Sequence, residues 1–173
     1  MTEGIGLPAW NALPDADAVQ ALRGCCASSR WAERVAADRP YATPEQLYAA
    51  ADRVLAELDE ADVDEALAAH PRIGDRPTGA DSRREQSGVA GASRDTKAEL
   101  AAANRAYEER FGHVYLVCAT GKDADELLAI LRSRLGNDAA TERRVLRAEL
   151  AKINYLRLRH LLHTTDHRTE ADR

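Results

Sequence analysis

A long helical repeat near the C-terminus constrains the fold of this chain more than any other feature of its sequence. Over residues 138–162, apolar side chains recur at intervals of three or four residues: Leu146, Leu150, Ile153 and Leu161. This spacing predicts one amphipathic helix with an apolar stripe along one side. The sequence therefore predicts a long helix that the rest of the chain must cover.

Arg157 falls in the middle of this apolar stripe, four residues after Ile153 and four before Leu161. A guanidinium buried without an anion costs several kcal/mol. Three interpretations remain open: an ion pair with a core Asp or Glu, a carboxylate ligand held by two N–H groups, or a side chain that reaches solvent along its apolar stem. Arg159 lies nearly opposite on the helix, where we expect it to be exposed.

Helical patterns also dominate the rest of the chain. Apolar spacing, capping residues and helix-stop signals predict further helices over residues 15–27, 31–37, 43–58, 62–70, 93–110 and 123–135. Residues 113–119 are apolar, β-branched and aromatic, and too few for a helix, so we expect a buried extended segment there. Without a second strand pattern, the sequence predicts an all-α fold: a compact, irregular helical bundle.

We expect this bundle to be a single domain over residues 1–173, with a polar, frayed tail after about residue 164. Residues 72–91 are rich in Gly, Pro and Arg and predict a loop region with one short helix inside it.

Charge and composition exclude several classes of function. The net charge is −5, and the arginines are dispersed, so the chain has no basic patch for nucleic acid or anionic lipid. No apolar run is long enough to span a bilayer, and neither end carries a secretory or peroxisomal signal, so we expect a cytoplasmic protein. Cys25, Cys26 and Cys118 have no zinc-like spacing, and we expect them to be reduced thiols.

His70 is the first candidate for chemistry. Pro71 follows it and ends the preceding helix, which places His70 at a junction between helix and loop. A histidine there can face a cavity and exchange a proton near neutral pH. The alternative is that His70 only terminates a helix at the surface.

Ser82, Glu85 and Gln86 form a second candidate. In a helix they share one face, because residues three and four apart are neighbours, and that face carries a hydroxyl, a carboxylate and an amide. The alternative is a capping box, in which Ser82 and Glu85 only close the start of a helix. The spacing alone slightly favours the cap.

Two further patterns do not support a site. His160, His163 and His167 could share a helix face as metal ligands, but they lie where we expect the chain to fray, with no carboxylate nearby. Gly121 and Lys122 lack the preceding glycine and the following Ser or Thr of a phosphate-binding loop.

Six segments taken together resemble the 2-oxo-4-hydroxy-4-carboxy-5-ureidoimidazoline (OHCU) decarboxylase family. They appear in the family's order and span nearly the whole chain, from Trp10 to Leu162. They are residues 25–31 (CCASSRW), 69–75 (AHPRIGD), 82–88 (SRREQSG), 104–112 (NRAYEERFG), 117–122 (VCATGK) and 152–158 (KINYLRL). His113 departs from the pattern, because the family more often has an aromatic residue there.

The resemblance implies an all-α, usually dimeric enzyme, without cofactor or metal, that converts OHCU to (S)-allantoin in urate breakdown. It implies that His70 is the catalytic acid and that Glu85 and Arg157 complete the catalytic group. It also implies a set of substrate-binding residues, some through their backbone: Pro71, Ser82, Arg83, Arg84, Glu85, Gln86, Tyr115, Leu116, Val117, Cys118, Ala119 and Arg157. Urate oxidase and hydroxyisourate hydrolase would be its pathway neighbours.

Two other functions are considered beside this one. A non-catalytic helical binding or dimerisation module would use His70 and Glu85 only to stop and cap helices. A metal-dependent hydrolase would use the C-terminal histidines. The first predicts that variants of His70, Glu85 and Arg157 change stability alone, and the second that a chelator abolishes activity.

Overall fold

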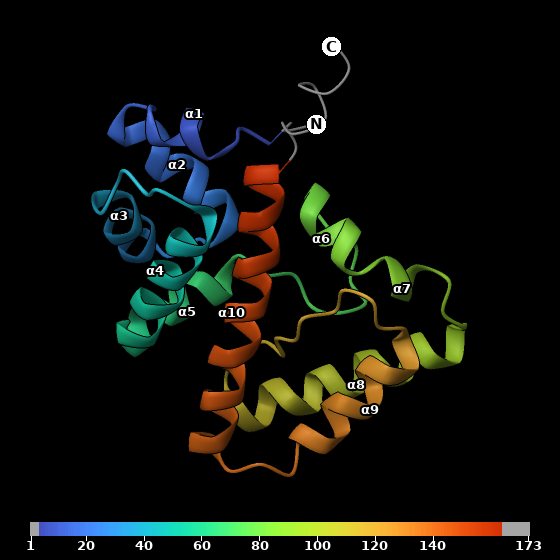
Figure 1. Ribbon diagram of the computed structural model, residues 1–173. Helices are drawn as coiled ribbons and strands as arrows, with labels where there is room; N and C mark the ends of the chain where they lie inside the picture. The colour runs from blue at the N-terminus through green and yellow to red at the C-terminus, as the bar shows by residue number, and fades with distance from the viewer. Residues whose placement is uncertain (1–3, 164–173) are drawn as a thin grey trace. The chain divides into compact units, whose positions relative to one another are not determined.

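The computed structural model describes residues 4–163 and is shown in Figure 1. These residues form ten helices and no strand, which confirms the predicted all-α class. The chain divides into two compact units. The discontinuous unit contains the described residues up to Ala66 and those from Ala151 onward, and the continuous unit contains Leu67–Leu150. The expectation that the whole chain is one domain stays a prediction.

Five N-terminal helices and the end of the last helix build the discontinuous unit. They are α1 (Leu7–Asn11), α2 (Asp15–Cys25), α3 (Ser29–Ala37), α4 (Pro44–Glu57), most of α5 (Glu60–Ala68) and the C-terminal part of α10 (Ala139–His163). The Thr43 hydroxyl accepts from the Gln46 N–H and Pro44 occupies the first turn, so α4 begins as its sequence predicts. Helix α1 was not expected.

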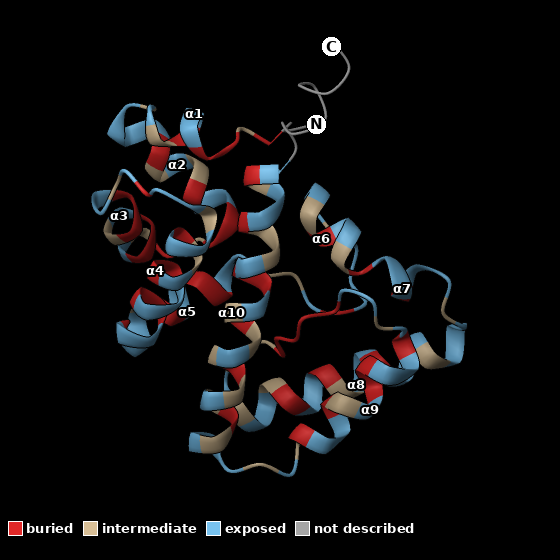
Figure 2. Cartoon of the chain, viewed as in Figure 1, coloured by how far each residue is buried: buried red, intermediate tan, exposed pale blue. Residues whose placement is uncertain are grey.

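The core of this unit is built around two tryptophans. Trp10 and Trp31 are fully buried, and each indole N–H donates to a backbone carbonyl, of Ala18 and Ala51 respectively. These bonds satisfy the one polar group of each indole, so the rings pack in the core without an unpaired donor. Figure 2 shows the buried faces of α2, α3 and α4 turned toward one another.

The continuous unit holds the remaining helices. They are α6 (Ala80–Glu85), α7 (Ser87–Ala90), α8 (Arg94–Phe111), α9 (Ala124–Arg134), the end of α5 and the N-terminal part of α10. Helix α8 begins at a Ser93 cap and ends at Gly112, whose φ of 77° is the left-handed conformation that closes a helix. Asp123 and Glu126 form a capping box that begins α9. The expected loop region over residues 72–91 contains two short helices rather than one.

Helices α8 and α9 pack together over a core that also includes part of the loop structure. The extended segment, residues 115–119, contributes Tyr115, Val117 and Ala119 to this core. His113 stacks on Phe111 and lies edge-on to Tyr107, with ring centroids 6.1 and 5.6 Å apart. The imidazole thus takes the place of the aromatic ring that the family resemblance led us to expect.

No helix within residues 4–163 is both long and apolar enough to cross a membrane.

Candidate functional site

His70 lies two residues beyond the end of α5 and begins a loop that the buried side-chain amides of Gln86 and Asn104 hold in place. The His70 N–H donates to the Leu67 carbonyl, and the side chain is half-buried. Further along the loop, the Gly74 N–H donates to Gln86 Oε1 at 3.0 Å, and Asn104 Nδ2 donates to the Ile73 carbonyl at 2.8 Å. The His70 loop is therefore tied to the residue that ends α6 and to the middle of α8.

The same loop is also fixed at its outer side. Arg72 makes a two-pronged ion pair with Glu108 of α8, with Nε–Oε1 and Nη2–Oε2 distances of 2.5 and 3.0 Å. Gly74 has a φ of 93°, and a Cβ added there would lie 3.1 Å from Leu100. Only glycine fits this turn without strain.

Helix α6 carries the predicted polar face. Ser82 and Gln86 are buried and Glu85 is half-buried, whereas Arg83 and Arg84 are exposed. Arg84 pairs with Asp81 on the same helix. The helix begins after Gly79, which makes no side-chain cap, and Ser82 lies inside it. The capping-box interpretation of Ser82 and Glu85 is therefore wrong.

Along residues 115–119, every second side chain joins the hydrophobic core, as expected for an extended chain. Tyr115, Val117 and Ala119 join the core of the continuous unit, whereas Leu116 and Cys118 do not belong to that cluster. In an extended chain, side chains and peptide groups both alternate in direction from one residue to the next. An extended segment is thus present, but it is buried only over residues 115–119, because His113 and Val114 of the predicted range 113–119 are half-buried. It pairs with no strand among the described residues.

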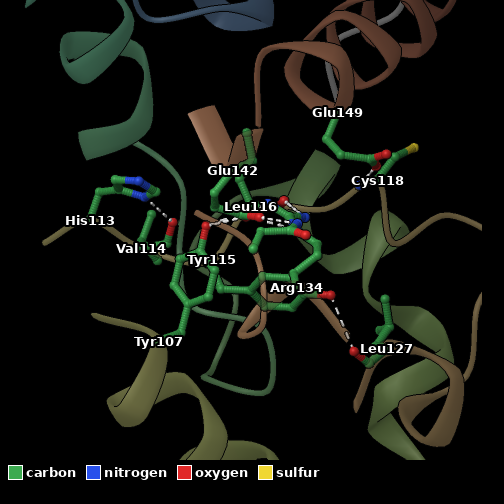
Figure 3. Close-up of polar contacts among 11 residues, drawn as sticks. Tyr107, His113, Val114, Tyr115, Leu116, Cys118, Leu127, Arg134, Glu142 and Glu149 are labelled. Atoms are coloured by element: carbon green, nitrogen blue, oxygen red, sulfur yellow. Dashed lines mark hydrogen bonds and ion pairs between the residues drawn. The ribbon is translucent and has the colours of Figure 1, made fainter. Parts of the chain in front are cut away.

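A buried ion pair supports this segment (Figure 3). Arg134, at the end of α9, pairs with Glu142, in the first turn of α10, and both side chains are almost fully buried. The Tyr107 hydroxyl donates to the same carboxylate, and burial, followed by that bond, raises the pKa of Tyr107. Arg134 Nη1 also donates to the Leu116 carbonyl at 2.6 Å. The ion pair therefore reaches the backbone of the extended segment directly.

The next peptide groups of the segment are also bound by charged side chains. The Cys118 N–H donates to Glu149 Oε2 at 2.8 Å, and Lys122 Nζ donates to the Cys118 carbonyl at 2.9 Å. Lys122 thus closes a turn of its own backbone rather than a phosphate loop. Within residues 4–163, no hydrogen bond uses the N–H or the carbonyl of Val117, which lies between these bound groups.

Gly88 brings α7 against this turn. A Cβ added to Gly88 would lie 2.2 Å from the Lys122 carbonyl oxygen, a backbone atom that cannot rotate away. Together with the Gln86–Gly74 bond, this approach gathers three segments in the continuous unit: the His70 loop, α6 with α7, and the extended segment with its turn.

We therefore expect Gly88→Ala to destabilise the protein by about 1–3 kcal/mol, as overpacking against backbone does. The control is Gly24→Ala: Gly24 lies within α2 with nothing near a Cβ, and alanine there should stabilise by about 0.5–1 kcal/mol. Thermal unfolding of both variants measures the difference. Equal midpoints for the two variants would contradict the close approach.

Arg157 belongs to the discontinuous unit, whereas the residues above belong to the continuous unit. Leu146, Leu150 and Ile153 are buried on α10, as predicted, but Leu161 is only half-buried, and Leu158 and Leu162 continue the buried stripe in its place. Arg157 is half-buried on it, and Nη1 donates to the Cys25 carbonyl at 3.3 Å, near the C-terminus of α2. Arg159 is exposed, as expected, and its guanidinium lies over the Tyr155 ring.

All three cysteines are buried, and none forms a disulfide within residues 4–163. Burial raises the pKa of the Cys26 thiol, and the Ser28 backbone, Asn154 and Arg157 offset only part of that effect. No group of three or more His, Cys, Asp or Glu suited to a metal occurs within residues 4–163. His167, the last of the C-terminal histidines, lies outside the described residues.

Comparison with known proteins finds consistent relatives. A family model described as OHCU decarboxylase matches residues 11–159. The chain is 32% identical over 142 residues to the "Uric acid degradation bifunctional protein TTL" of Arabidopsis thaliana, which covers 78% of this chain and 44% of that protein. It is 31% identical over 131 residues to the "2-oxo-4-hydroxy-4-carboxy-5-ureidoimidazoline decarboxylase" of Amia calva, covering 72% of this chain and 75% of that protein.

A solved structure is also similar. It is the crystal structure of an OHCU decarboxylase in the presence of (S)-allantoin, with a TM-score of 0.75 and 28% identity, covering 86% of this chain and 98% of the other. The chain spans less than half the length of the plant relative.

Proposed function

The chain belongs to the OHCU decarboxylase family, and from this premise we propose that it converts OHCU to (S)-allantoin and carbon dioxide in urate breakdown. One observation supports the proposal most: three of the family-like segments meet in the continuous unit. The Gln86–Gly74 hydrogen bond joins the His70 loop to α6, and Gly88 touches the turn after the extended segment. A chain that kept only a helical scaffold would not need these polar segments to meet.

The proposed reaction begins when the bond to the carboxylate breaks and carbon dioxide leaves. The electron pair stays on the ring and spreads into the neighbouring carbonyl or imine system, so the enzyme must stabilise negative charge there. His70 then donates a proton to one face of the carbon that becomes the stereocentre, and Glu85 orients the imidazole. Donation to one face yields a single enantiomer.

The remaining residues are proposed to hold the substrate. Ser82 and the Nε2 of Gln86 donate from α6, because Gln86 Oε1 is already used by Gly74. In the extended segment, the protein itself binds the Leu116 carbonyl and both the N–H and the carbonyl of Cys118. The N–H and carbonyl of Val117, like those of Tyr115, make no hydrogen bond within residues 4–163, and we propose that those of Val117 meet the substrate. Tyr115 and Ala119 are proposed to face the substrate through their backbone, since their side chains lie in the core, and Pro71 lines the site. The exposed Arg83 and Arg84 contribute positive charge near it. Arg157 enters on the sequence resemblance, as the ligand of an anionic group.

The proposal extends to the protein's state and surroundings. We propose a homodimer, tested by light scattering. We also propose a cytoplasmic location, which the three cysteines without a disulfide fit. Urate oxidase and hydroxyisourate hydrolase would supply the substrate. The reaction would need no metal or cofactor, so activity should survive a chelator.

The direct test generates OHCU in place from urate, with urate oxidase and hydroxyisourate hydrolase, and follows circular dichroism as allantoin accumulates. We expect the protein to produce a rapid, single-signed signal. A slow, optically silent conversion equal to the enzyme-free control would instead support a non-catalytic helical module.

Replacement of Arg157 should weaken substrate binding more than it changes the folded protein. We expect Arg157→Ala to raise KM by about 10- to 100-fold, the value of a hydrogen bond to a charged group, and Arg157→Lys to recover only part of this because lysine cannot bind two oxygens in parallel. Arg159→Ala, on the exposed side of α10, is the matched control. Equal KM values for the variants at both positions would remove Arg157 from substrate binding.

A further inference from the structure

We infer that Arg134, Glu149 and Lys122 form a charged clamp that orients the Val117 peptide groups toward the substrate. None of the three is a residue that touches the reacting atoms; they are positioning residues. The inference rests on the proposed function, because it assigns a partner to Val117 in that reaction. It is drawn entirely from contacts within the continuous unit.

Arg134 is the strongest member of the clamp. Its guanidinium lies in the core, where an arginine is normally kept only with its charge and its N–H groups satisfied. Glu142 neutralises the charge, yet Nη1 is committed to a neutral acceptor, the Leu116 carbonyl. Figure 3 marks with dashed lines the contacts that join Arg134 to Glu142 and to the Leu116 backbone. The core ion pair thus fixes one backbone carbonyl of a segment that pairs with no strand among the described residues.

Charged side chains bind both the N–H and the carbonyl of Cys118. Glu149 accepts from its N–H and Lys122 donates to its carbonyl, so an anion and a cation match the two ends of the dipole. Charge-assisted hydrogen bonds of this kind are roughly twice as strong as neutral ones. A loop does not need charged partners merely to satisfy its backbone hydrogen bonds, because water or neighbouring backbone groups would do so.

Val117 is the residue between these fixed points. It is 4% exposed, and within residues 4–163 neither its N–H nor its carbonyl makes a hydrogen bond. Buried backbone groups are almost always paired. Because the protein supplies no partner for this N–H and this carbonyl, we infer that the substrate does. OHCU carries amide N–H and carbonyl groups that match a peptide in both directions.

The alternation of an extended chain links the clamp to Val117. In an extended chain, the N–H and carbonyl groups of residues 116 and 118 point to one side, and those of residue 117 point to the opposite side. The clamp binds groups on the first side and leaves the N–H and carbonyl of Val117 on the second. If the segment rotated about its long axis, the bound groups and the Val117 groups would turn together. By holding the groups on one side, the clamp therefore sets the direction of the Val117 N–H and carbonyl on the other.

The test compares pairs of variants at the two clamp residues outside the core. Glu149→Ala removes the acceptor for the Cys118 N–H, whereas Glu149→Gln keeps an oxygen in the same place. Lys122→Met removes the donor, and Lys122→Arg keeps one. We expect kcat to fall at least tenfold and the enantiomeric excess of allantoin to drop in Glu149→Ala and Lys122→Met. The Gln and Arg variants should stay within about threefold of the wild-type protein.

The enantiomeric excess separates positioning from mere stability. A variant that is only less stable has fewer active molecules, but each still protonates one face, so its product remains a single enantiomer. Unchanged enantiomeric excess and kcat in Glu149→Ala and Lys122→Met, with both proteins folded, would overturn the clamp.

Amide exchange gives a readout that does not require catalysis. By NMR, the Cys118 N–H should exchange slowly in the wild-type protein and in Glu149→Gln, and at least tenfold faster in Glu149→Ala. Adding (S)-allantoin should shift the Val117 amide resonance in the wild-type protein and less in Glu149→Ala. If the wild-type protein makes no allantoin but shows both effects, the proposed reaction fails and the clamp stands. If it is active but both amide effects are absent, the clamp fails and the reaction stands.

Discussion

His70→Ala is expected to slow the enzymatic formation of allantoin by about 10²- to 10⁴-fold, the usual contribution of a general acid. The remaining product should form without a preferred face, because the uncatalysed reaction also proceeds and has no chiral proton donor. Circular dichroism during in situ generation of OHCU measures both effects at once. His70→Ala that still gave a single enantiomer at the wild-type rate would remove His70 from proton transfer.

A second histidine in the same unit provides the control for this result. His113 stacks with Phe111 and Tyr107 and has no assigned part in the reaction. His113→Phe keeps an aromatic ring in that position and should retain the rate and the enantiomeric excess. Loss of activity in both variants would point to a general sensitivity of this unit rather than to proton transfer by His70.

Glu142→Leu should cause a large loss of stability. The substitution leaves the Arg134 guanidinium buried without its counter-ion and takes the acceptor from the Tyr107 hydroxyl. Breaking a buried pair in this way costs about 3–5 kcal/mol, or roughly 10 °C in Tm for a chain of this size. Thermal unfolding measured by circular dichroism or calorimetry gives the shift.

The same substitution at Glu57 is the matched control, because Glu57 pairs with Arg34 at the surface. Exposed pairs contribute about 0–1 kcal/mol, so Glu57→Leu should change Tm little. Adding Arg134→Met to Glu142→Leu should recover part of the loss, since it removes the unpaired charge. Equal Tm values for Glu142→Leu and Glu57→Leu would show that the ion pair is not buried in solution.

The helices could be predicted where their ends carry side-chain signals. Thr43 and Ser93 cap the starts of α4 and α8, and Gly112 ends α8, as the sequence indicates. Helix α1 has only five residues, too few for an apolar repeat to appear. Helix α6 begins at Gly79 without a side-chain cap, and the Ser82–Glu85 spacing inside it imitates a capping box. Local patterns fail where a helix is short and its cap is made by backbone.

The buried ion pair was hidden from sequence reasoning for a physical reason. Arg134 lies in the last turn of α9 and Glu142 in the first turn of α10, which are the ends where positive and negative side chains normally complement the helix dipole. Each residue alone resembles an ordinary surface charge. Arg157 was noticeable because its neighbours on the helix are apolar, whereas Arg134 and Glu142 meet only after the chain turns between two helices.

The site could be predicted residue by residue only from the family resemblance. The spacing of Ser82, Glu85 and Gln86 indicated a shared face, and burial follows it, but spacing did not show that Gln86 holds the His70 loop. Nor does any sequence pattern show that the protein binds backbone groups of Leu116 and Cys118 but not those of Val117. That difference arises from hydrogen bonds made by residues up to 31 positions away in the chain.

The two units also differ in when they can be completed during synthesis. Residues 67–150 leave the ribosome as one uninterrupted stretch, so every partner in the Arg134–Glu142 pair is present before the chain ends. The helices before Ala66 precede the continuous unit in the sequence but pack in one unit with residues from Ala151 onward. For example, the Ile5 N–H donates to the Leu161 carbonyl at 2.7 Å, and this bond can form only after Leu161 has been added to the chain. The discontinuous unit is therefore completed after the continuous one, because its last backbone contacts come from the C-terminal part of α10.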